Sequence, residues 1–337
     1  MTLLFNLVLL LMGLFALAKG ADVFVEGASG LAARLGIPSL VVGLTIVALG
    51  TSAPEAAISI ASASQSTSSM AIAGVFGSNI INTLVILGVT ALVVEVPVRH
   101  TTMRYEIPFV VFVTMVLLVL GVRDGWLGRG DSLFLLLLLT AYLAYLLFIA
   151  RRSSEPSELS SEPGEPALKS RGGNKDEGGA SVPGERTPMR SLPKLVLLCL
   201  VGAVAICAGA QFTVNGATKI ARMLGMSERV VGLTVIALGT SLPELVTSLA
   251  AARKGQADIA IGNVVGSSIF NVLFVLGASG VIAPMPFAPE LLFDGVVALA
   301  SVALLWLVCL RNRRLGRVGG VSLLASYAVY LGTVLVG

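Results

Sequence analysis

The chain has 337 residues, of which 55% are hydrophobic and only 12% are charged, and its formal net charge is +4. Soluble globular proteins carry about 25% charged residues, so this composition excludes an ordinary soluble domain and indicates a polytopic membrane protein. The basic residues lie mostly at the ends of apolar runs, where membrane topology accounts for them, and they give no sign of nucleic-acid binding.

Long apolar runs predict ten membrane-spanning helices, five in each half of the chain. Most of these runs approach the roughly 20 residues that cross a bilayer as a helix. The first run has the apolar character of a signal peptide, but no Lys or Arg precedes it, so we interpret it as the first span. The predicted spans are 3–29, 39–63, 70–94, 107–121 and 132–150 in the first half, and 193–222, 230–252, 258–283, 288–310 and 319–336 in the second half.

The two halves are joined by a segment of different composition, 151–191, which is rich in Ser, Pro, Gly, Glu and Lys. Such a segment buries too little apolar surface to fold by itself, and its acidic residues do not follow the pattern of a calcium-binding loop. We therefore predict a first five-helix half at 1–150, a disordered linker at 151–191 and a second five-helix half at 192–337. A regulatory segment is the alternative interpretation of the linker.

The two halves contain an internal repeat, because 27–88 aligns with 216–277 without a gap. Gly-Leu-Thr-Ile-Val-Ala-Leu-Gly-Thr-Ser-Ala-Pro-Glu at 43–55 aligns with Gly-Leu-Thr-Val-Ile-Ala-Leu-Gly-Thr-Ser-Leu-Pro-Glu at 232–244. Since each half has an odd number of spans, the second half enters the membrane from the opposite side, which makes the repeats inverted. The predicted fold is therefore an all-α polytopic membrane protein with ten transmembrane helices in two inverted five-helix repeats.

The charges of the loops predict the orientation. Cytoplasmic loops carry more Lys and Arg than outer loops. With the N-terminus outside, the inner loops hold most of the basic residues, including Arg99, Arg104, Arg151 and Arg152. The sequence thus predicts a multi-pass protein of the cell (inner) membrane, with both termini outside and the linker 151–191 in the cytoplasm.

Glu55 and Glu244 are the candidate functional carboxylates, since an ionisable residue deep in a span costs several kcal/mol unless it faces partners or water. Hydroxyl-bearing residues, together with one alanine, share a helix face with each glutamate. The residues on these faces are Ala48, Thr51 and Ser52 in the first half, and Ala237, Thr240 and Ser241 in the second. Calcium takes six to eight oxygen ligands, and two carboxylates neutralise one divalent charge. Sodium accepts the same oxygens, so the predicted site suits either ion.

A proline immediately precedes each glutamate, at Pro54 and Pro243. A proline inside a helix removes its own hydrogen bond and displaces the carbonyl four residues earlier, which here belongs to Gly50 or Gly239. We therefore expect both helices to break at the middle of the membrane, as in ion-coupled carriers.

A second pair of motifs adds polar side chains at i, i+4 spacing: Ser78 with Asn82, and Ser267 with Asn271. Small residues and asparagine also serve helix packing in membranes, which is the alternative interpretation of these motifs. Their repetition in both halves, together with the need for further oxygen ligands, favours ion coordination.

The paired Gly-Thr-Ser-x-Pro-Glu and Gly-Ser-x-x-x-Asn motifs closely resemble the alpha-repeats of the cation/calcium exchanger superfamily, in particular its prokaryotic sodium/calcium exchanger-type members. The resemblance covers most of the chain outside the linker. It implies a central divalent site at Glu55 and Glu244, hydroxyl ligands from the serines and threonines named above, backbone carbonyl ligands at Ala48 and Ala237, and polar positions at Asn82 and Asn271. It also implies that the first and sixth spans slide across the remaining bundle.

Two positions depart from relatives in this superfamily. Asn271 stands where some members, including potassium-dependent ones, carry Asp, which argues against potassium coupling. The first repeat also has Gly74 where the second has Asn263, the more usual form. The two halves are therefore expected to differ near the third span of each repeat.

The resulting prediction is a sodium/calcium antiporter that works by alternating access. A calcium/proton antiporter with the same fold is the alternative, in which one of the glutamates takes up a proton when the ion leaves. A passive channel is disfavoured because an inverted repeat predicts a closed site at the midplane. An enzyme is disfavoured because no His or Lys lies within the motif spans to activate a nucleophile. The predicted partners are calcium and sodium ions and the lipid bilayer, with no nucleic acid and no resident cofactor.

Overall fold

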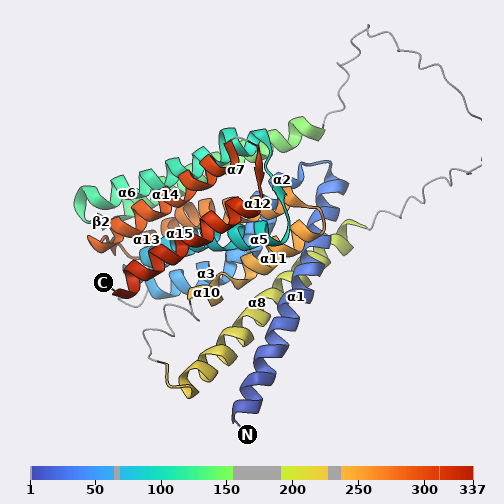
Figure 1. Ribbon diagram of the computed structural model, residues 1–337. Helices are drawn as coiled ribbons and strands as arrows, with labels where there is room; N and C mark the ends of the chain where they lie inside the picture. The colour runs from blue at the N-terminus through green and yellow to red at the C-terminus, as the bar shows by residue number, and fades with distance from the viewer. Residues whose placement is uncertain (1, 64–68, 155–190, 227–236, 311, 337) are drawn as a thin grey trace, which may run out of the picture.

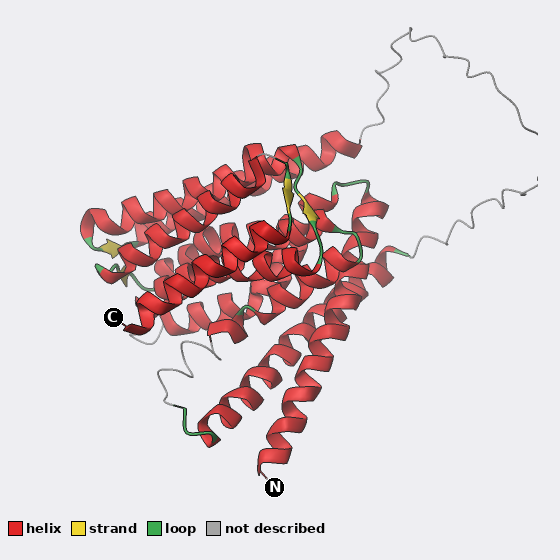
Figure 2. Cartoon of the chain, viewed as in Figure 1, coloured by secondary structure: helices red, strands yellow, loops and turns green. Residues whose placement is uncertain are grey.

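The computed structural model describes residues 2–63, 69–154, 191–226, 237–310 and 312–336, and helices make up most of them (Figure 2). The helices of the first half are α1 (Thr2–Leu35), α2 (Ser39–Val42), η1 (Gly43–Val47), α3 (Ala48–Ala63), α4 (Ser69–Ile80), η2 (Ile81–Ile86), α5 (Leu87–Val93), η3 (Thr102–Glu106), α6 (Ile107–Asp124) and α7 (Arg129–Ser154). Those of the second half are α8 (Leu192–Met223), α10 (Ala237–Thr240), α11 (Leu242–Arg253), α12 (Ala257–Phe270), η5 (Asn271–Val275), α13 (Leu276–Ile282), α14 (Glu290–Leu310) and α15 (Arg317–Val336). The η segments are single π-helical turns within longer helices.

Eight helical stretches in the described part of the chain are long and apolar enough to cross a membrane. They correspond to eight of the ten predicted spans. Of the remaining two, 230–252 begins within 227–236, which lies outside the described residues, and continues as α10 and α11. The other, 319–336, is the 20-residue helix α15. The predicted linker falls largely on 155–190, also outside the described residues. Its first four residues, 151–154, extend α7 by about one turn.

Helices α1 and α8 run side by side and antiparallel, and they diverge from the rest of the bundle toward the N-terminus (Figure 1). The contact between α1 and α8 is the most extensive one between any two described elements. It depends on glycines, because a Cβ at Gly202 would lie 2.6 Å from the backbone nitrogen of Phe24, and one at Gly209 would lie 2.7 Å from that of Leu17. Small residues of this kind allow the backbones of membrane helices to approach closely.

The remaining helices pack around α12, which is almost entirely buried. A large apolar core joins both halves, and it includes Ile72 and Phe76 of α4 and Val264 and Ile269 of α12. A smaller core lies between α1, α8 and the neighbouring ends of η1 and α11–α12. The molecule is therefore divided into a helix pair and a larger bundle, with the motif-bearing helices in between.

The prediction of an all-α fold needs a small correction, since the described part of the chain contains four two-residue strands. β1 (Val96–Pro97) pairs with β4 (Arg314–Leu315), and β2 (Trp126–Leu127) pairs with β3 (Met285–Pro286), both antiparallel. The strands lie in loops, where pairing satisfies backbone groups that no helix uses. Each strand pair joins a loop of the first half to a loop of the second. The two pairs lie at opposite ends of the bundle (Figure 2).

The two motif prolines behave differently, which corrects the prediction that both helices break. In the first half, α3 continues through Pro54. In the second half, α10 ends at Thr240, and α11 begins at Leu242 with Pro243 in its first turn. A proline is tolerated in the first turn because no intrahelical bond is lost there. The break therefore leaves Ser241 between two helices, while Ser52 remains within one.

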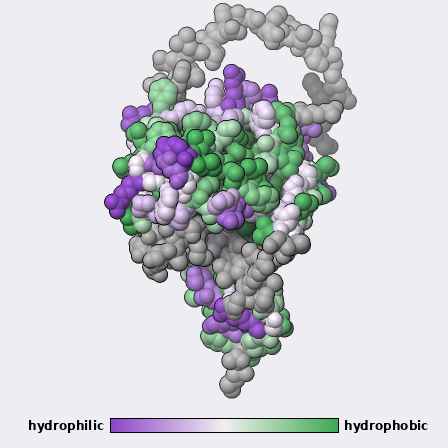
Figure 3. All heavy atoms as spheres, turned by 90° about the vertical axis from the view of Figure 1, so that its left-hand side faces the viewer, coloured by the Kyte–Doolittle hydropathy of each residue, from purple (hydrophilic) through white to green (hydrophobic). Residues whose placement is uncertain are grey.

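The outer faces of the long helices are apolar. Side chains such as Phe15 of α1, Val119 of α6 and Leu137 of α7 are about two-thirds exposed, at 67%, 66% and 65%. Figure 3 faces the end of the bundle that carries β2 and shows patches of hydrophilic side chains with hydrophobic side chains between and around them. An apolar lateral surface with polar ends is the expected form of a bundle that sits in a bilayer.

Candidate ion-binding site

Four elements bring the predicted site residues together in the middle of the bundle: α3 and α4 of the first half, and α11 and α12 of the second (Figure 1). The repeated motifs place a carboxylate on α3 and on α11, and a serine followed by an asparagine at the ends of α4 and α12. Both asparagines stand at the start of a π-helical turn, Asn82 in η2 and Asn271 in η5. Such turns occur frequently at functional sites.

The carboxylate of Glu55 is held by residues from both halves. Its Oε1 accepts a hydrogen bond from Ser78 Oγ at 2.8 Å and lies 3.4 Å from Ser241 Oγ. Its Oε2 accepts a bond from Asn271 Nδ2 at 3.2 Å. Ser241 and Asn271 belong to the second half, so this cluster ties the two repeats together across the centre of the molecule.

The carboxylate of Glu244 has a reciprocal environment. Ser52 Oγ, from the first half, lies 2.9 Å from Oε1 of Glu244 and also 2.9 Å from Oγ of Ser267. All three residues are fully buried, at 0% exposed. Each glutamate therefore contacts the Thr-Ser motif of the opposite repeat. This is expected if the two polar helix faces meet about a pseudo-two-fold axis.

The two glutamates differ in their access to solvent. Glu244 is fully buried, whereas Glu55 is partly exposed. The surroundings differ in the same way: Ala53, Ala57 and Ala73 are exposed beside Glu55, while the whole of α12 after its first turn is buried beside Glu244. The residues around Glu55 are thus more exposed than those around Glu244.

The other predicted residues take several positions. Thr51 is fully buried, and its Oγ1 lies 3.1 Å from the carbonyl of Val47 and 3.0 Å from Oδ1 of Asn263. Asn82 is fully buried, and neither of its polar side-chain atoms has a hydrogen-bond partner in the described part of the chain. Ala48 begins α3, while Ala237 begins α10 and Thr240 ends it. No hydrogen bond among the described residues joins Asn82, Ala48 or Ala237 to a glutamate side chain.

Two asparagines contribute contacts that sequence reasoning did not predict. Asn79 Nδ2 donates to the carbonyl of Ser268 at 3.2 Å, which links α4 to α12. Asn263 Nδ2 lies 2.9 Å from Ser248 Oγ and 3.3 Å from the carbonyl oxygen of Glu244. The difference between Asn263 and Gly74 was visible in the sequence. From the sequence this difference indicates only that the packing of the two halves differs there. The hydrogen-bond partners of Asn263 could not be predicted, because they are distant in the chain.

Replacing Asn263 by Ala is expected to destabilise the fold, because it removes three buried hydrogen bonds, those with Thr51, Ser248 and the Glu244 backbone. Each such bond contributes about 0.5–1.5 kcal/mol, so we expect a loss of about 3 kcal/mol in the free energy of unfolding. The readout is the thermal midpoint of the purified protein in detergent. Gly74→Ala is the matched control at the equivalent position, because a Cβ there meets nothing within 4 Å. Equal midpoints for the two variants would contradict this role of Asn263.

The chemistry of the cluster suits a hard cation. Its potential ligand atoms are carboxylate, hydroxyl and amide oxygens, which Ca²⁺ and similar ions prefer. Three buried oxygens are acceptors without a hydrogen-bond donor among the described residues: Oε2 of Glu244, Oδ1 of Asn271 and Oδ1 of Asn82. A buried acceptor without a partner is costly, and a bound cation would offset that cost. The described residues contain no group of three or more His, Cys, Asp or Glu side chains that could hold a metal ion, so a cation here would depend on hydroxyl, amide and carbonyl oxygens in addition to the two carboxylates.

Comparison with known proteins gives a consistent picture. The family model described as sodium/calcium exchanger protein matches residues 5–149 and 194–336. The putative antiporter CaxA of Alkalimonas amylolytica is 37% identical to the chain, over 96% of this chain and 96% of the relative. The inner membrane protein YrbG of Escherichia coli is 35% identical, over 96% and 94% respectively. The sodium/calcium exchanger MaX1 of Methanosarcina acetivorans is 32% identical, over 97% of each chain.

A solved structure is also similar over nearly the full length. The sodium-calcium exchanger NCX_Mj, soaked with 2.5 mM Na⁺ and 1 mM Sr²⁺, superimposes with a TM-score of 0.79 at 27% sequence identity, over 97% of this chain and 97% of the other. The similarity extends through both halves, so that it includes every helix that carries a predicted site residue.

Proposed function

Because the chain belongs to the sodium/calcium exchanger protein family, whose members are membrane antiporters, we propose that it exchanges Ca²⁺ for Na⁺ across the cell (inner) membrane. The observation that carries this proposal is the pair of carboxylates at the centre of the bundle, each in contact with the Thr-Ser motif of the opposite repeat. Two carboxylates balance the charge of one Ca²⁺, and the surrounding oxygens also suit Na⁺.

We propose that Glu55 and Glu244 provide the charge of the site and that neighbouring oxygens complete the coordination. The additional ligands in this proposal are Thr51, Ser52, Ser78, Asn82, Thr240, Ser241, Ser267 and Asn271 through their side chains, and Ala48 and Ala237 through their carbonyls. Ca²⁺ and Na⁺ are the transported substrates in this scheme, and no resident cofactor takes part.

The proposed architecture is ten transmembrane helices in two inverted five-helix repeats. Two features support the inversion: the corresponding helices α1 and α8 are antiparallel, and the two related strand pairs lie at opposite ends of the bundle (Figure 2). The halves in this proposal are 1–150 and 192–337, joined by the linker 151–191. The distribution of Arg and Lys supports both termini outside and the linker in the cytoplasm.

The proposed mechanism is alternating access. Its support is the unequal exposure of Glu55 and Glu244, because a site that is open along one face and closed along the other is what one half of such a cycle requires. The close glycine contacts between α1 and α8 support movement of this pair as one body against the remaining bundle, a motion that would exchange the open face for the closed one.

Calcium flux into proteoliposomes tests the proposal. The purified protein is reconstituted with a sodium gradient or, separately, with a proton gradient of equal size, and ⁴⁵Ca²⁺ uptake is measured. We expect uptake that follows the sodium gradient and is absent without it. Uptake that responds to the proton gradient alone would favour a calcium/proton antiporter with the same site. Calcium leakage that is independent of both gradients would contradict exchange.

A further inference from the structure

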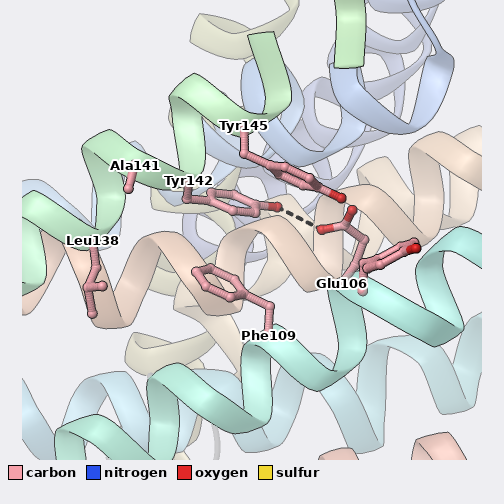
Figure 4. Close-up of a pocket in the computed structure, with 7 residues that line it drawn as sticks. Glu106, Phe109, Leu138, Ala141, Tyr142 and Tyr145 are labelled. Carbon is pink, nitrogen blue, oxygen red and sulfur yellow. Dashed lines mark hydrogen bonds between the residues drawn. The ribbon is translucent and has the colours of Figure 1, made fainter. Parts of the chain in front are cut away.

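A second polar cluster lies in the membrane-spanning part of the first half, away from the carboxylate pair. It surrounds Glu106, at the junction of η3 and α6, and it faces Tyr142 of α7 (Figure 4). A cavity of about 320 Å³ opens here. The residues that line it are Tyr105, Glu106, Phe109, Leu138, Ala141, Tyr142 and Tyr145.

The carboxyl group of Glu106 is buried, with 3% of the residue exposed. Tyr142 Oη donates to its Oε2 at 3.2 Å and is its hydrogen-bond partner among the residues that the structure describes. The nearby Arg104 does not pair with it, since its guanidinium lies over the ring of Tyr105 at 5.9 Å from the centroid. A buried acid in a membrane span that has no basic partner is a functional hypothesis by default.

Comparison with the second half shows which part of this cluster is structural. Asp294 of α14 accepts a hydrogen bond from Tyr330 of α15 at 2.9 Å, and this acid and tyrosine are 36 residues apart, as Glu106 and Tyr142 are. An acid–tyrosine bond between the fourth and fifth spans is therefore common to both halves and serves to join these helices. The two halves differ in the side chains around this bond.

The aromatic rings account for the difference. The residue three positions after the acid is Phe109 in the first half and Val297 in the second. The residue three positions after the tyrosine is Tyr145 in the first half and Thr333 in the second. Phe109 stacks on Tyr142 with 4.8 Å between the ring centroids, and Tyr145 stacks on Tyr142 at 6.4 Å. In Figure 4 the hydroxyl groups of Tyr142 and Tyr145 point toward the carboxylate. The first half thus combines a buried carboxylate with several aromatic faces.

This combination selects an organic ammonium group. Aromatic faces attract cations, above all when water is excluded, and the carboxylate supplies the opposite charge. A hard metal ion needs six or more oxygens, whereas the apolar remainder of the wall suits hydrocarbon. Tyr105 and Tyr145 are exposed on the outer surface of the bundle, so the cavity is accessible from the lipid side. Glu106 lies four residues into the span that begins at Thr102, which is about 6 Å of helix rise and is shallow enough for a lipid headgroup to reach.

We infer that Glu106 and the surrounding aromatic rings form a binding site for an ammonium group attached to a hydrocarbon chain, as found in an aminophospholipid headgroup or in a free amphiphilic amine. The ligand would lie between α6 and α7 of the first half. Asp294 of the second half also lies near aromatic rings, since Phe293 and Tyr327 pack on Tyr330, but Val297 and Thr333 stand where the first half has Phe109 and Tyr145.

Fluorine NMR of protein labelled with 3-fluorotyrosine tests this inference. The chain has five tyrosines, of which Tyr105, Tyr142 and Tyr145 line the cavity, while Tyr327 and Tyr330 lie at the second acid and serve as internal controls. Each signal is assigned by a single Tyr→Phe variant. In phosphatidylglycerol nanodiscs, dodecylammonium is expected to shift the cavity signals saturably and to leave the two control signals unchanged. Dodecanol, the neutral analogue, is expected not to do so.

Two kinds of variant make the test specific. Glu106→Gln is expected to weaken dodecylammonium binding by about tenfold or more, and Asp294→Asn is expected to leave it unchanged. The double variant Phe109→Val, Tyr145→Thr gives the first half the residues of the second at these two positions and keeps the acid–tyrosine bond. It therefore provides the test even if Glu106→Gln does not fold. Equal responses to dodecanol, or wild-type affinity in Glu106→Gln or in the double variant, would overturn the inference. Phosphatidylethanolamine nanodiscs distinguish the sources: the same shift without added amine identifies a lipid headgroup, and its absence identifies a free amine.

Discussion

Replacing Glu244 by Gln is expected to abolish sodium-driven calcium uptake in proteoliposomes, and Glu55→Gln is expected to do the same. Each substitution is nearly isosteric but removes one of the two charges that balance Ca²⁺. Removing one partner of a buried charge pair costs about 3–5 kcal/mol, which corresponds to a loss of affinity of about a hundredfold or more. The effect should be larger at Glu244, because this side chain is fully buried and has no access to water.

The comparison that isolates this effect uses Glu290→Gln. Glu290 is an exposed acid in the first turn of α14, outside the central cluster. Calcium uptake by the Glu290→Gln variant should therefore equal that of the wild type. Size-exclusion profiles of all three variants show whether the fold is retained. Full sodium-driven uptake in either Glu55→Gln or Glu244→Gln would remove that glutamate from the proposed site.

Replacing Gly209 by Ala is expected to destabilise the protein strongly, although the change adds a single carbon atom. The new Cβ would lie 2.7 Å from the backbone nitrogen of Leu17 and 2.8 Å from the carbonyl oxygen of Gly13. Both contacts are with backbone, so α1 and α8 must move apart as whole helices. Overpacking of this kind costs about 1–3 kcal/mol, and we expect lower thermal midpoints together with reduced uptake.

The matched control for this effect is Gly332→Ala. Gly332 lies within α15, and a Cβ there meets nothing within 4 Å. Alanine is a better helix former than glycine by about 1 kcal/mol, so the control should be as stable as the wild type or more so. If Gly209→Ala matched this control, the close approach of α1 and α8 would not depend on the glycine.

The sequence predicted the elements of the fold well where the signal was periodic or repeated. Long apolar runs located the helices to within a few residues at most boundaries, and the duplicated motif identified both glutamates. The end of the first span was predicted six residues too early, at 29. The helix continues to Leu35, and Asp22 pairs with Lys254 of the other half at 3.2 Å.

Features that depend on partners distant in the chain were beyond prediction. Asn263 stands out in the sequence only as a departure from Gly74, and its three contacts reach α3, α11 and the backbone of Glu244. Glu106 was placed just outside a predicted span at 107–121, whereas the span begins at Thr102 and contains it. Its pairing with Tyr142 arises from the packing of α6 against α7, which hydropathy does not encode. Asp294 did carry a usable signal, since it is an acid within a predicted span.

The unequal burial of Glu55 and Glu244 has a consequence for states of the molecule other than this one. The two repeats carry the same motif in two conformations: one has a continuous helix with a partly exposed acid, and the other has a broken helix with a buried acid. Giving each repeat the conformation of its counterpart generates a second structure of the same chain, in which Glu244 is exposed and Glu55 is closed off. In that repeat-swapped form, Ser52 would stand at a helix break and Ser241 within a helix. In the proposed alternating-access cycle, these two conformations of the repeated motif would correspond to the two end points of the movement, and thiol labelling of cysteines introduced at positions 53 and 242 would report which of the two is populated.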